Sequence, residues 1–165
     1  MVTYDPVSSA AILTANASTF GQRVIPNYHF DKADYIVSFN ADFLGTWISP
    51  IEYAHDYAKG RKIDDVTHAH MSKHVQVESH MSVTGSNADN RIMVKPSEQG
   101  TAIAYLYQQV QGTGASSGGL NPKAESALKK LASQLTRARG KSLICLLYTS
   151  PSPRDQRGSR MPSSA

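Results

Sequence analysis

The segment from Tyr35 to Gly60 places the strongest constraint on the fold of this chain. It begins with YIVSF, an apolar run with a β-branched centre that is typical of a buried strand in a parallel sheet. A polar loop follows, and Ser49-Pro50-Ile51-Glu52 then predicts a helix that starts with a capping box and stops at Gly60. This strand–loop–helix order is typical of α/β proteins, which hold phosphates or cofactor tails at helix starts.

Segments with strand and helix patterns alternate along the rest of the chain. HVQVES, RIMVK and KSLI predict further strands, whereas RVIPNYHF is interrupted by Pro26 and predicts an edge strand or a loop. Helix boundaries are predicted at Asp5-Pro6, Gly21, Pro96-Ser97-Glu98, Asn121-Pro122 and Gly140. This alternation predicts an α/β fold with a mainly parallel sheet.

The last 21 residues differ in composition from the rest. The string CLLYTSPSPRDQRGSRMPSSA, residues 145–165, is rich in Ser, Pro and Arg and resembles the translation of a sequencing adapter. A disordered tail is the alternative interpretation. We therefore expect residues 1–144 to form one partial α/β domain. Because the sequence begins and ends in the middle of this pattern of strands and helices, we also expect the chain to be a fragment of a longer protein.

Composition excludes several classes of function. The formal net charge is +4, and because Lys and Arg are scattered, no nucleic-acid partner is predicted. The sequence contains no run of 18 apolar residues, so no membrane span is predicted. The first residues do not resemble a signal peptide. Cys145 is the single cysteine, so neither a disulfide framework nor a cluster held by cysteines of this chain alone is possible.

The loop SFNADFLGTW is the first candidate binding site, because loops at the carboxyl ends of parallel strands bind ligands in α/β proteins. Its small or polar residues are Asn40, Asp42, Gly45 and Thr46. The loop has no glycine-rich phosphate-binding motif, and Asp42 would repel a phosphate unless a cation intervened. Phe43 and Trp47 are expected to pack against the following helix.

The turn SVTGSNADN is the second candidate. Thr84 and Asn87 precede a predicted strand, and Asp89 is expected to cap or brace the sheet. The helix that begins after Lys95-Pro96-Ser97-Glu98 can accept an anion at its start, although plain capping explains the same residues.

The histidines form the third candidate. His68, His70 and His74 have the spacing H-x-H-x-x-x-H. This spacing suits a metal site if the segment folds back; the alternative is that these are solvated histidines of a loop. Glu78 and His80 are expected to form a surface pair on one strand face. Spacing alone supports no Ser-His-Asp or Cys-His arrangement, so no catalytic residue and no metal ligand is assigned.

The order of these motifs resembles the molybdopterin oxidoreductase family. Ala33-Asp34 and Ala88-Asp89 match two "AD" positions of that family, and Lys95-Pro96-Ser97-Glu98 matches a turn into a helix. The longer strings RVIPNYHFDKADYIVSFNADFLGTWISPIEYA and MSKHVQVESHMSVTGSNADNR resemble one branch, the molybdopterin-oxidoreductase-like iron–sulfur subunit of alternative complex III. The resemblance covers nearly all of residues 1–144 and implies a three-layer domain.

The resemblance implies a function in respiratory electron transfer from quinol to cytochrome c or an oxidase. It implies iron–sulfur clusters in a separate C-terminal half, cytochrome c and quinol-binding membrane subunits as partners, and a peripheral position on the periplasmic side of the bacterial inner membrane. At the cofactor loop, Ala41-Asp42 replaces the Asn-Pro pair of the family. This departure predicts that the loop is a scaffold that has lost its ligand.

Two alternatives remain. In an active molybdopterin enzyme, Asn40, Asp42, Thr84 and Asn87 would line the nucleotide arm of molybdopterin guanine dinucleotide. In the second alternative, the chain is a standalone small α/β binding domain.

Overall fold

The computed structural model describes residues 9–63, 66–67, 69–114 and 116–147, and the chain divides into two units. The described part of the smaller unit contains α1, Ala10–Phe20, which ends at Gly21 as predicted, with the glycine in the left-handed conformation (φ 71°). The predicted helix start at Asp5-Pro6 lies outside the described residues. The larger unit, Tyr28–Leu147, contains the sheet.

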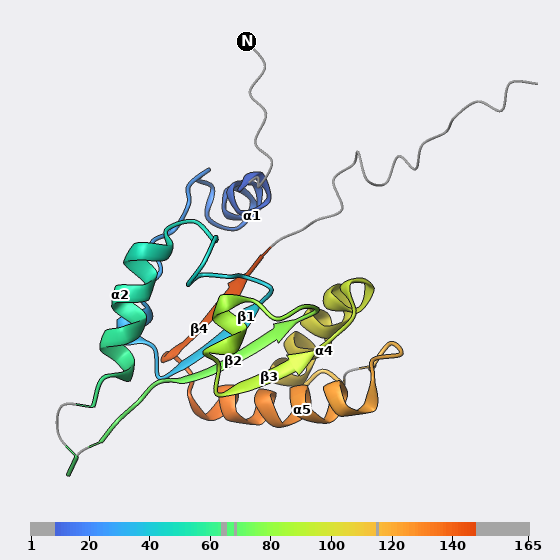
Figure 1. Ribbon diagram of the computed structural model, residues 1–165. Coiled ribbons are helices and arrows are strands. Elements are labelled where there is room, and N and C mark those ends of the chain that lie inside the picture. The colour runs from blue at the N-terminus through green and yellow to red at the C-terminus, as the bar shows by residue number, and fades with distance from the viewer. Residues whose placement is uncertain (1–8, 64–65, 68, 115, 148–165) are drawn as a thin grey trace, which may run out of the picture. The chain divides into compact units, whose positions relative to one another are not determined.

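Four parallel strands form the sheet in the order β3-β2-β1-β4 (Figure 1). The strands are β1 (Tyr35–Phe39), β2 (Lys73–Glu78), β3 (Asn90–Met93) and β4 (Ser142–Leu146). The predicted α/β class with a parallel sheet is therefore confirmed.

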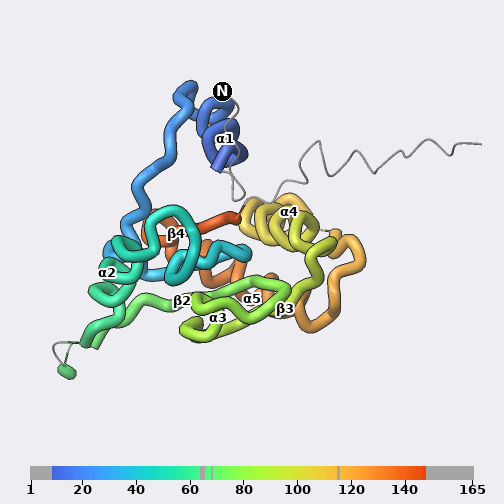
Figure 2. The backbone as a smooth tube through the Cα atoms, turned by 45° about the horizontal axis from the view of Figure 1, so that its top comes forward, coloured from blue at the N-terminus to red at the C-terminus, as the bar shows by residue number. Residues whose placement is uncertain are grey.

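One face of the sheet is covered by α4 (Gln99–Gln111) and α5 (Pro122–Arg137), which lie side by side (Figure 1, Figure 2). The start of α5 follows the prediction, because the Asn121 side chain accepts a hydrogen bond from the Lys123 backbone and Pro122 occupies the first turn. The apolar core on this face includes Val37, Phe39, Val75, Val77, Ile92, Ala102, Leu106, Leu128, Leu131 and Leu135.

Aromatic side chains cover part of the opposite face. They come from the short 3-10 helix η1 (Phe30–Lys32), the loop after β1, and α2 (Pro50–Arg61). Phe43 stacks on Phe30 with ring centroids 4.4 Å apart and also contacts Tyr57 and His74, while Trp47 contacts Tyr28 and Tyr53. Phe43 and Trp47 therefore serve in packing, as expected.

Three local predictions need correction. The predicted capping box at Ser49 does not form, because the Ser49 hydroxyl donates to the Glu52 carboxylate (3.3 Å) and caps no backbone N–H. Helix α2 continues one residue beyond Gly60, whose missing side chain leaves room for the Phe30 carbonyl oxygen. The turn SVTGSNADN contains a short helix, α3 (Val83–Ser86), capped by the Ser82 hydroxyl.

Two other segments behave as predicted: RVIPNYHF is a loop up to His29, and KSLI enters strand β4. That strand extends to Leu146, so it includes the first two residues of the segment predicted as adapter-derived, and the Leu147 N–H donates to the Phe39 carbonyl. The origin of this segment stays a prediction, and residues 148–165 lie outside the described residues. In the described part of the chain, no helix has the length and apolar character needed to cross a membrane.

Candidate functional site

The loop after β1 starts where the strand order changes direction. From β1 the chain proceeds to β2 and β3 on one side, whereas β4 pairs with β1 on the other. Ligands of open α/β sheets bind at this kind of position, beyond the carboxyl ends of the strands. The loop predicted as a candidate site lies at such a position.

Asn40 joins the ends of the two central strands. Its backbone N–H donates to the Val77 carbonyl (2.9 Å), and its side-chain oxygen accepts from the Ser79 N–H (3.3 Å). Its φ of 54° is left-handed, a conformation that asparagine tolerates better than most residues. The Asn40 side-chain oxygen thus has a partner within the protein.

Asp42 organises the loop from within. Its carbonyl oxygen accepts from the N–H groups of Gly45, Thr46 and Trp47. Its carboxylate Oδ1 accepts from the Thr84 backbone N–H (3.0 Å) and hydroxyl (2.7 Å), and the Thr84 hydroxyl oxygen in turn accepts from the Leu44 N–H (2.9 Å). The carboxylate expected to repel a phosphate is therefore bonded to the start of α3.

Glu78 approaches the same short helix from the end of β2. It is fully buried, and its carboxylate accepts from the Ser82 hydroxyl (2.7 Å), weakly from the Ser82 N–H (3.4 Å), and from Arg91 Nε (2.5 Å). A Cβ on Gly85 would lie 2.0 Å from Glu78 Oε1, so only glycine fits there. The expected surface pair of Glu78 with His80 is wrong, since Glu78 is buried with Arg91.

The structure brings three of the four candidate residues together. Asn40, Asp42 and Thr84 meet around the loop, and Thr84 is buried. Asn87 lies at the far end of α3, where it is exposed and its side chain donates to the Val83 carbonyl (2.8 Å). These residues do not fit a pyrophosphate, because the carboxylates of Asp42 and Glu78 already accept from the donors at the start of α3.

A buried polar row on β2 escaped the sequence analysis. His74, Gln76 and Glu78 occupy alternate positions, and their side chains are linked at 3.3 Å each. Burial lowers the pKa of His74 to about 4, while Gln76 opposes this shift by hydrogen bonding. The Tyr57 hydroxyl lies 3.1 Å from His74 Nδ1 and donates to the Asn87 carbonyl. The imidazole is therefore neutral near pH 7.

Asp89 braces the sheet, as expected. It accepts from the His74 backbone N–H (2.7 Å) and receives two hydrogen bonds from Arg61 (2.7 and 2.9 Å). The hydrogen bond from Arg61 is the main reason that the pKa of Asp89 is lowered. Arg61 also donates to the Ser72 carbonyl, so α2 is tied to the starts of β2 and β3.

The three histidines of the H-x-H-x-x-x-H pattern have separate surroundings. His70 is exposed, with Nε2 3.5 Å from Asp34, whereas His74 is buried between Tyr57 and Gln76. His68 lies outside the described residues. The described members of the pattern therefore do not form a metal site.

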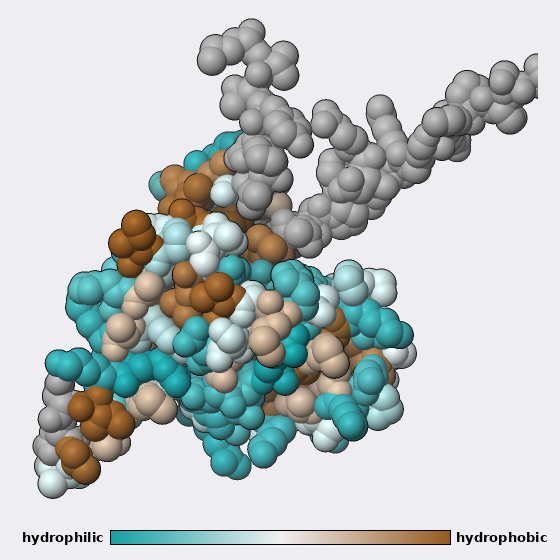
Figure 3. All heavy atoms as spheres, viewed as in Figure 1, coloured by the Kyte–Doolittle hydropathy of each residue, from teal (hydrophilic) through white to brown (hydrophobic). Residues whose placement is uncertain are grey.

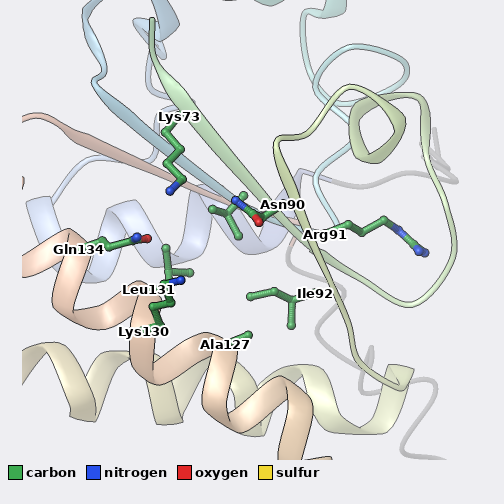
Figure 4. A pocket seen from close by; sticks show the side chains of 9 residues that line it. Lys73, Asn90, Arg91, Ile92, Ala127, Lys130, Leu131 and Gln134 are labelled. Atoms are coloured by element: carbon green, nitrogen blue, oxygen red, sulfur yellow. The ribbon is translucent and has the colours of Figure 1, made fainter.

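A cavity of about 210 Å³ lies far from the loop, beside the amino ends of β2 and β3 and against α5 (Figure 4). Lys73 and Lys130 line it, and Arg91 points away from it toward Glu78. Beside the loop itself, Met81 and Val83 are exposed, and the face in Figure 3 shows apolar patches within a largely hydrophilic surface. Neither Asn40 nor Asp42 lines the cavity beside α5.

Cys145 is buried in β4, and burial raises the pKa of its thiol. A single buried thiol of this kind is neutral at pH 7 and cannot hold an iron–sulfur cluster by itself.

The sequence matches no protein-family model, and a search of curated proteins also found no match.

Proposed function

We propose that this chain is the scaffold part of a respiratory electron-transfer subunit, in which a former cofactor loop now holds the fold together. The parent would belong to the alternative complex III type and transfer electrons from quinol to cytochrome c or an oxidase. One observation supports the scaffold role more than any other: the Asp42 carboxylate accepts both hydrogen bonds that Thr84 offers, at 3.0 and 2.7 Å.

The physical basis is competition for donors. A phosphate that approached α3 would have to displace Asp42 from Thr84 and Glu78 from Ser82, and it would meet two negative charges on the way. Buried carboxylates that lose their partners incur a large desolvation cost. Anion binding here would therefore be unfavourable, as is expected of a structural loop.

The resemblance supplies the rest of this proposal. Iron–sulfur clusters would reside in other sequence of the parent subunit, and the described α/β unit would pack against that part and against cytochrome c and quinol-binding membrane subunits. The complex would lie on the periplasmic side of the bacterial inner membrane. In this arrangement, the chain contributes neither a catalytic residue nor a metal ligand to electron transfer.

Calorimetric titration of the purified chain with guanosine diphosphate, which represents the nucleotide arm of the cofactor, tests the scaffold role. We expect no saturable binding to the wild type or to Asp42→Asn, because Glu78 and the loop itself still fill the start of α3. Tight binding that is lost in Thr84→Val would instead support an active molybdopterin enzyme, with Asn40, Asp42, Thr84 and Asn87 near the nucleotide arm.

Affinity purification of the parent subunit tests the respiratory assignment. We expect it to retain haem c proteins and iron while lacking stoichiometric molybdenum. A chain that purifies alone and unfolds in one cooperative transition would instead support a standalone α/β binding domain.

A further inference from the structure

Three side chains with metal-binding atoms meet where η1 packs against α2. They are His29, at the start of η1, Asp31 within η1, and Asp56 in the middle of α2. One ligand atom from each lies within 4.8 Å of the other two. This cluster is separate from the loop at Asn40 and Asp42 and does not depend on the proposed function.

Burial of Phe30 fixes the two residues that flank it. The Phe30 ring is fully buried against Phe43 and Tyr53, with centroid distances of 4.4 and 5.0 Å. Tyr53 lies about one helical turn before Asp56 on α2. Gly60 adds to this close packing, since a Cβ there would lie 3.3 Å from the Phe30 carbonyl oxygen. The backbone therefore positions the three ligands before any ion arrives.

The charges around the cluster favour a cation. Among the described residues, no hydrogen bond or ion pair involves the side chains of His29 and Asp31. Asp56 has only loose partners: Lys59 Nζ at 3.7 Å, from a side chain that is half exposed, and His55 Nδ1 at 3.4 Å. Two neighbouring carboxylates repel each other, and a divalent ion between them would remove this repulsion.

We propose that His29, Asp31 and Asp56 bind a divalent transition metal ion, with Zn²⁺ as the best-suited ion. One imidazole and two carboxylates suit Zn²⁺, whereas Mg²⁺ and Ca²⁺ prefer sites made only of oxygen atoms. Because the three ligand atoms lie no more than 4.8 Å from one another, an ion equidistant from them could lie at most about 2.8 Å from each, against about 2.0–2.2 Å in formed Zn²⁺ sites. Side-chain shifts below about 1 Å would close the site, and water would complete the coordination.

Calorimetric titration of the full chain with Zn²⁺ tests this site. We expect one equivalent to bind, and we expect His29→Gln, Asp31→Asn and Asp56→Asn each to weaken binding by at least about tenfold. His29 and Asp31 are exposed and Asp56 is partly buried, and the Asp56→Asn change keeps the size of the side chain, so circular dichroism should show that all three variants fold. His80→Gln removes another exposed histidine away from the cluster and should leave affinity unchanged.

Lys59→Gln provides the opposite test. Because Lys59 competes with the ion for Asp56, this variant should bind Zn²⁺ more tightly than the wild type. Bound Zn²⁺ should also raise the melting temperature, since it links η1 to α2. Absence of saturable binding would overturn the proposal, and so would binding that survives in His29→Gln but is lost in His80→Gln.

Discussion

On the face of the sheet under α4 and α5, β2 presents Val75 and Val77, whereas on the opposite face the same strand presents His74, Gln76 and Glu78. All five side chains are buried to a similar degree. The apolar face is stabilised by non-directional removal of surface from water, and the polar face depends on specific partners for each donor and acceptor. Substitutions on the two faces should therefore destabilise the protein for different reasons: loss of apolar burial on one face and loss of specific hydrogen-bond partners on the other.

Glu78→Ala should give the largest effect, because it leaves Arg91 and Ser82 without their buried partner. Breaking a fully buried charged pair from one side costs about 3–5 kcal/mol; because the Arg91 side chain is 25% exposed, we expect a loss near the lower end of this range in the free energy of unfolding, measured by urea denaturation. Exposed Glu52→Ala is the control and should change stability by less than about 1 kcal/mol. Equal losses in both variants would show that the polar face does not depend on this pair.

Leu128→Ala tests the apolar face. Because Leu128 on α5 is fully buried, its truncation should lower the free energy of unfolding by about 3 kcal/mol. Substitution of its exposed neighbour, Lys129→Ala, is the control. Because Leu128 and Glu78 lie on opposite faces and share no partner, the losses of the double variant should add to within about 0.5 kcal/mol. Strong non-additivity in urea denaturation would contradict the independence of the two faces.

His74 makes the polar face sensitive to acid. Because burial lowers its pKa from 6.5 to about 4, the unfolded chain binds the proton more tightly than the folded protein. The neutral imidazole therefore gives its full contribution above pH 6.5, and stability falls as the pH drops toward 4, by roughly 3 kcal/mol in total.

The measurement for His74 is the free energy of unfolding of the wild type minus that of His74→Gln, followed from pH 7 to pH 4. The subtraction removes most of the contribution of other groups, including Asp89, whose lowered pKa also reduces stability in acid. A difference that does not change with pH would contradict a buried, neutral His74.

Thr84→Val keeps the shape of the side chain and removes the hydroxyl that joins Asp42 to the Leu44 N–H. We expect a loss of about 1–3 kcal/mol, because the Asp42 carboxylate loses a partner in a partly buried place. Thr46→Val, on the exposed side of the same loop, should be nearly neutral. Thermal denaturation of both variants distinguishes a structural loop from one whose polar residues are free for a ligand.

Tyr57→Phe should give the smallest effect. It removes the hydroxyl that bonds the Asn87 carbonyl and contacts His74, while the ring keeps its contact with Phe43. We expect a loss of about 1 kcal/mol, against no change for the exposed Tyr107→Phe. A larger loss, measured in urea, would show that the row from Tyr57 to Glu78 behaves as one cooperative network.

Local sequence patterns predict much of this fold but little of its polar face. Local sequence specifies β1 through its apolar run, and α5 through its N-terminal cap and the apolar residues on one of its faces. The pattern alone therefore identifies both elements. The alternation in HVQVE equally suits a strand with one face in water. Only contacts from distant parts of the chain, such as Tyr57 and Arg91, make that polar face buried.

The candidate site shows the same limit. Sequence reasoning located the loop and named Asn40, Asp42 and Thr84, which do lie together, but Asn87 is separated from them by the length of α3. Gly85 in VTGS was a usable signal, since an isolated glycine within an element often marks a place where another group comes close. In the structure this group is the Glu78 carboxylate. The cluster of His29, Asp31 and Asp56 spans two elements, so no spacing rule reveals it.

The packing of Gly45 against Asp42 sets the order in which mutations can accumulate. A Cβ on Gly45 would collide with the Asp42 carboxylate, so a side chain at position 45 would require this carboxylate to move from its place beside Thr84. Shortening residue 42 first would remove the clash and make the second change permissible. Substitutions at positions 42 and 45 are therefore expected to be coupled, with Gly45→Ala less destabilising in an Asp42→Ala background than in the wild type.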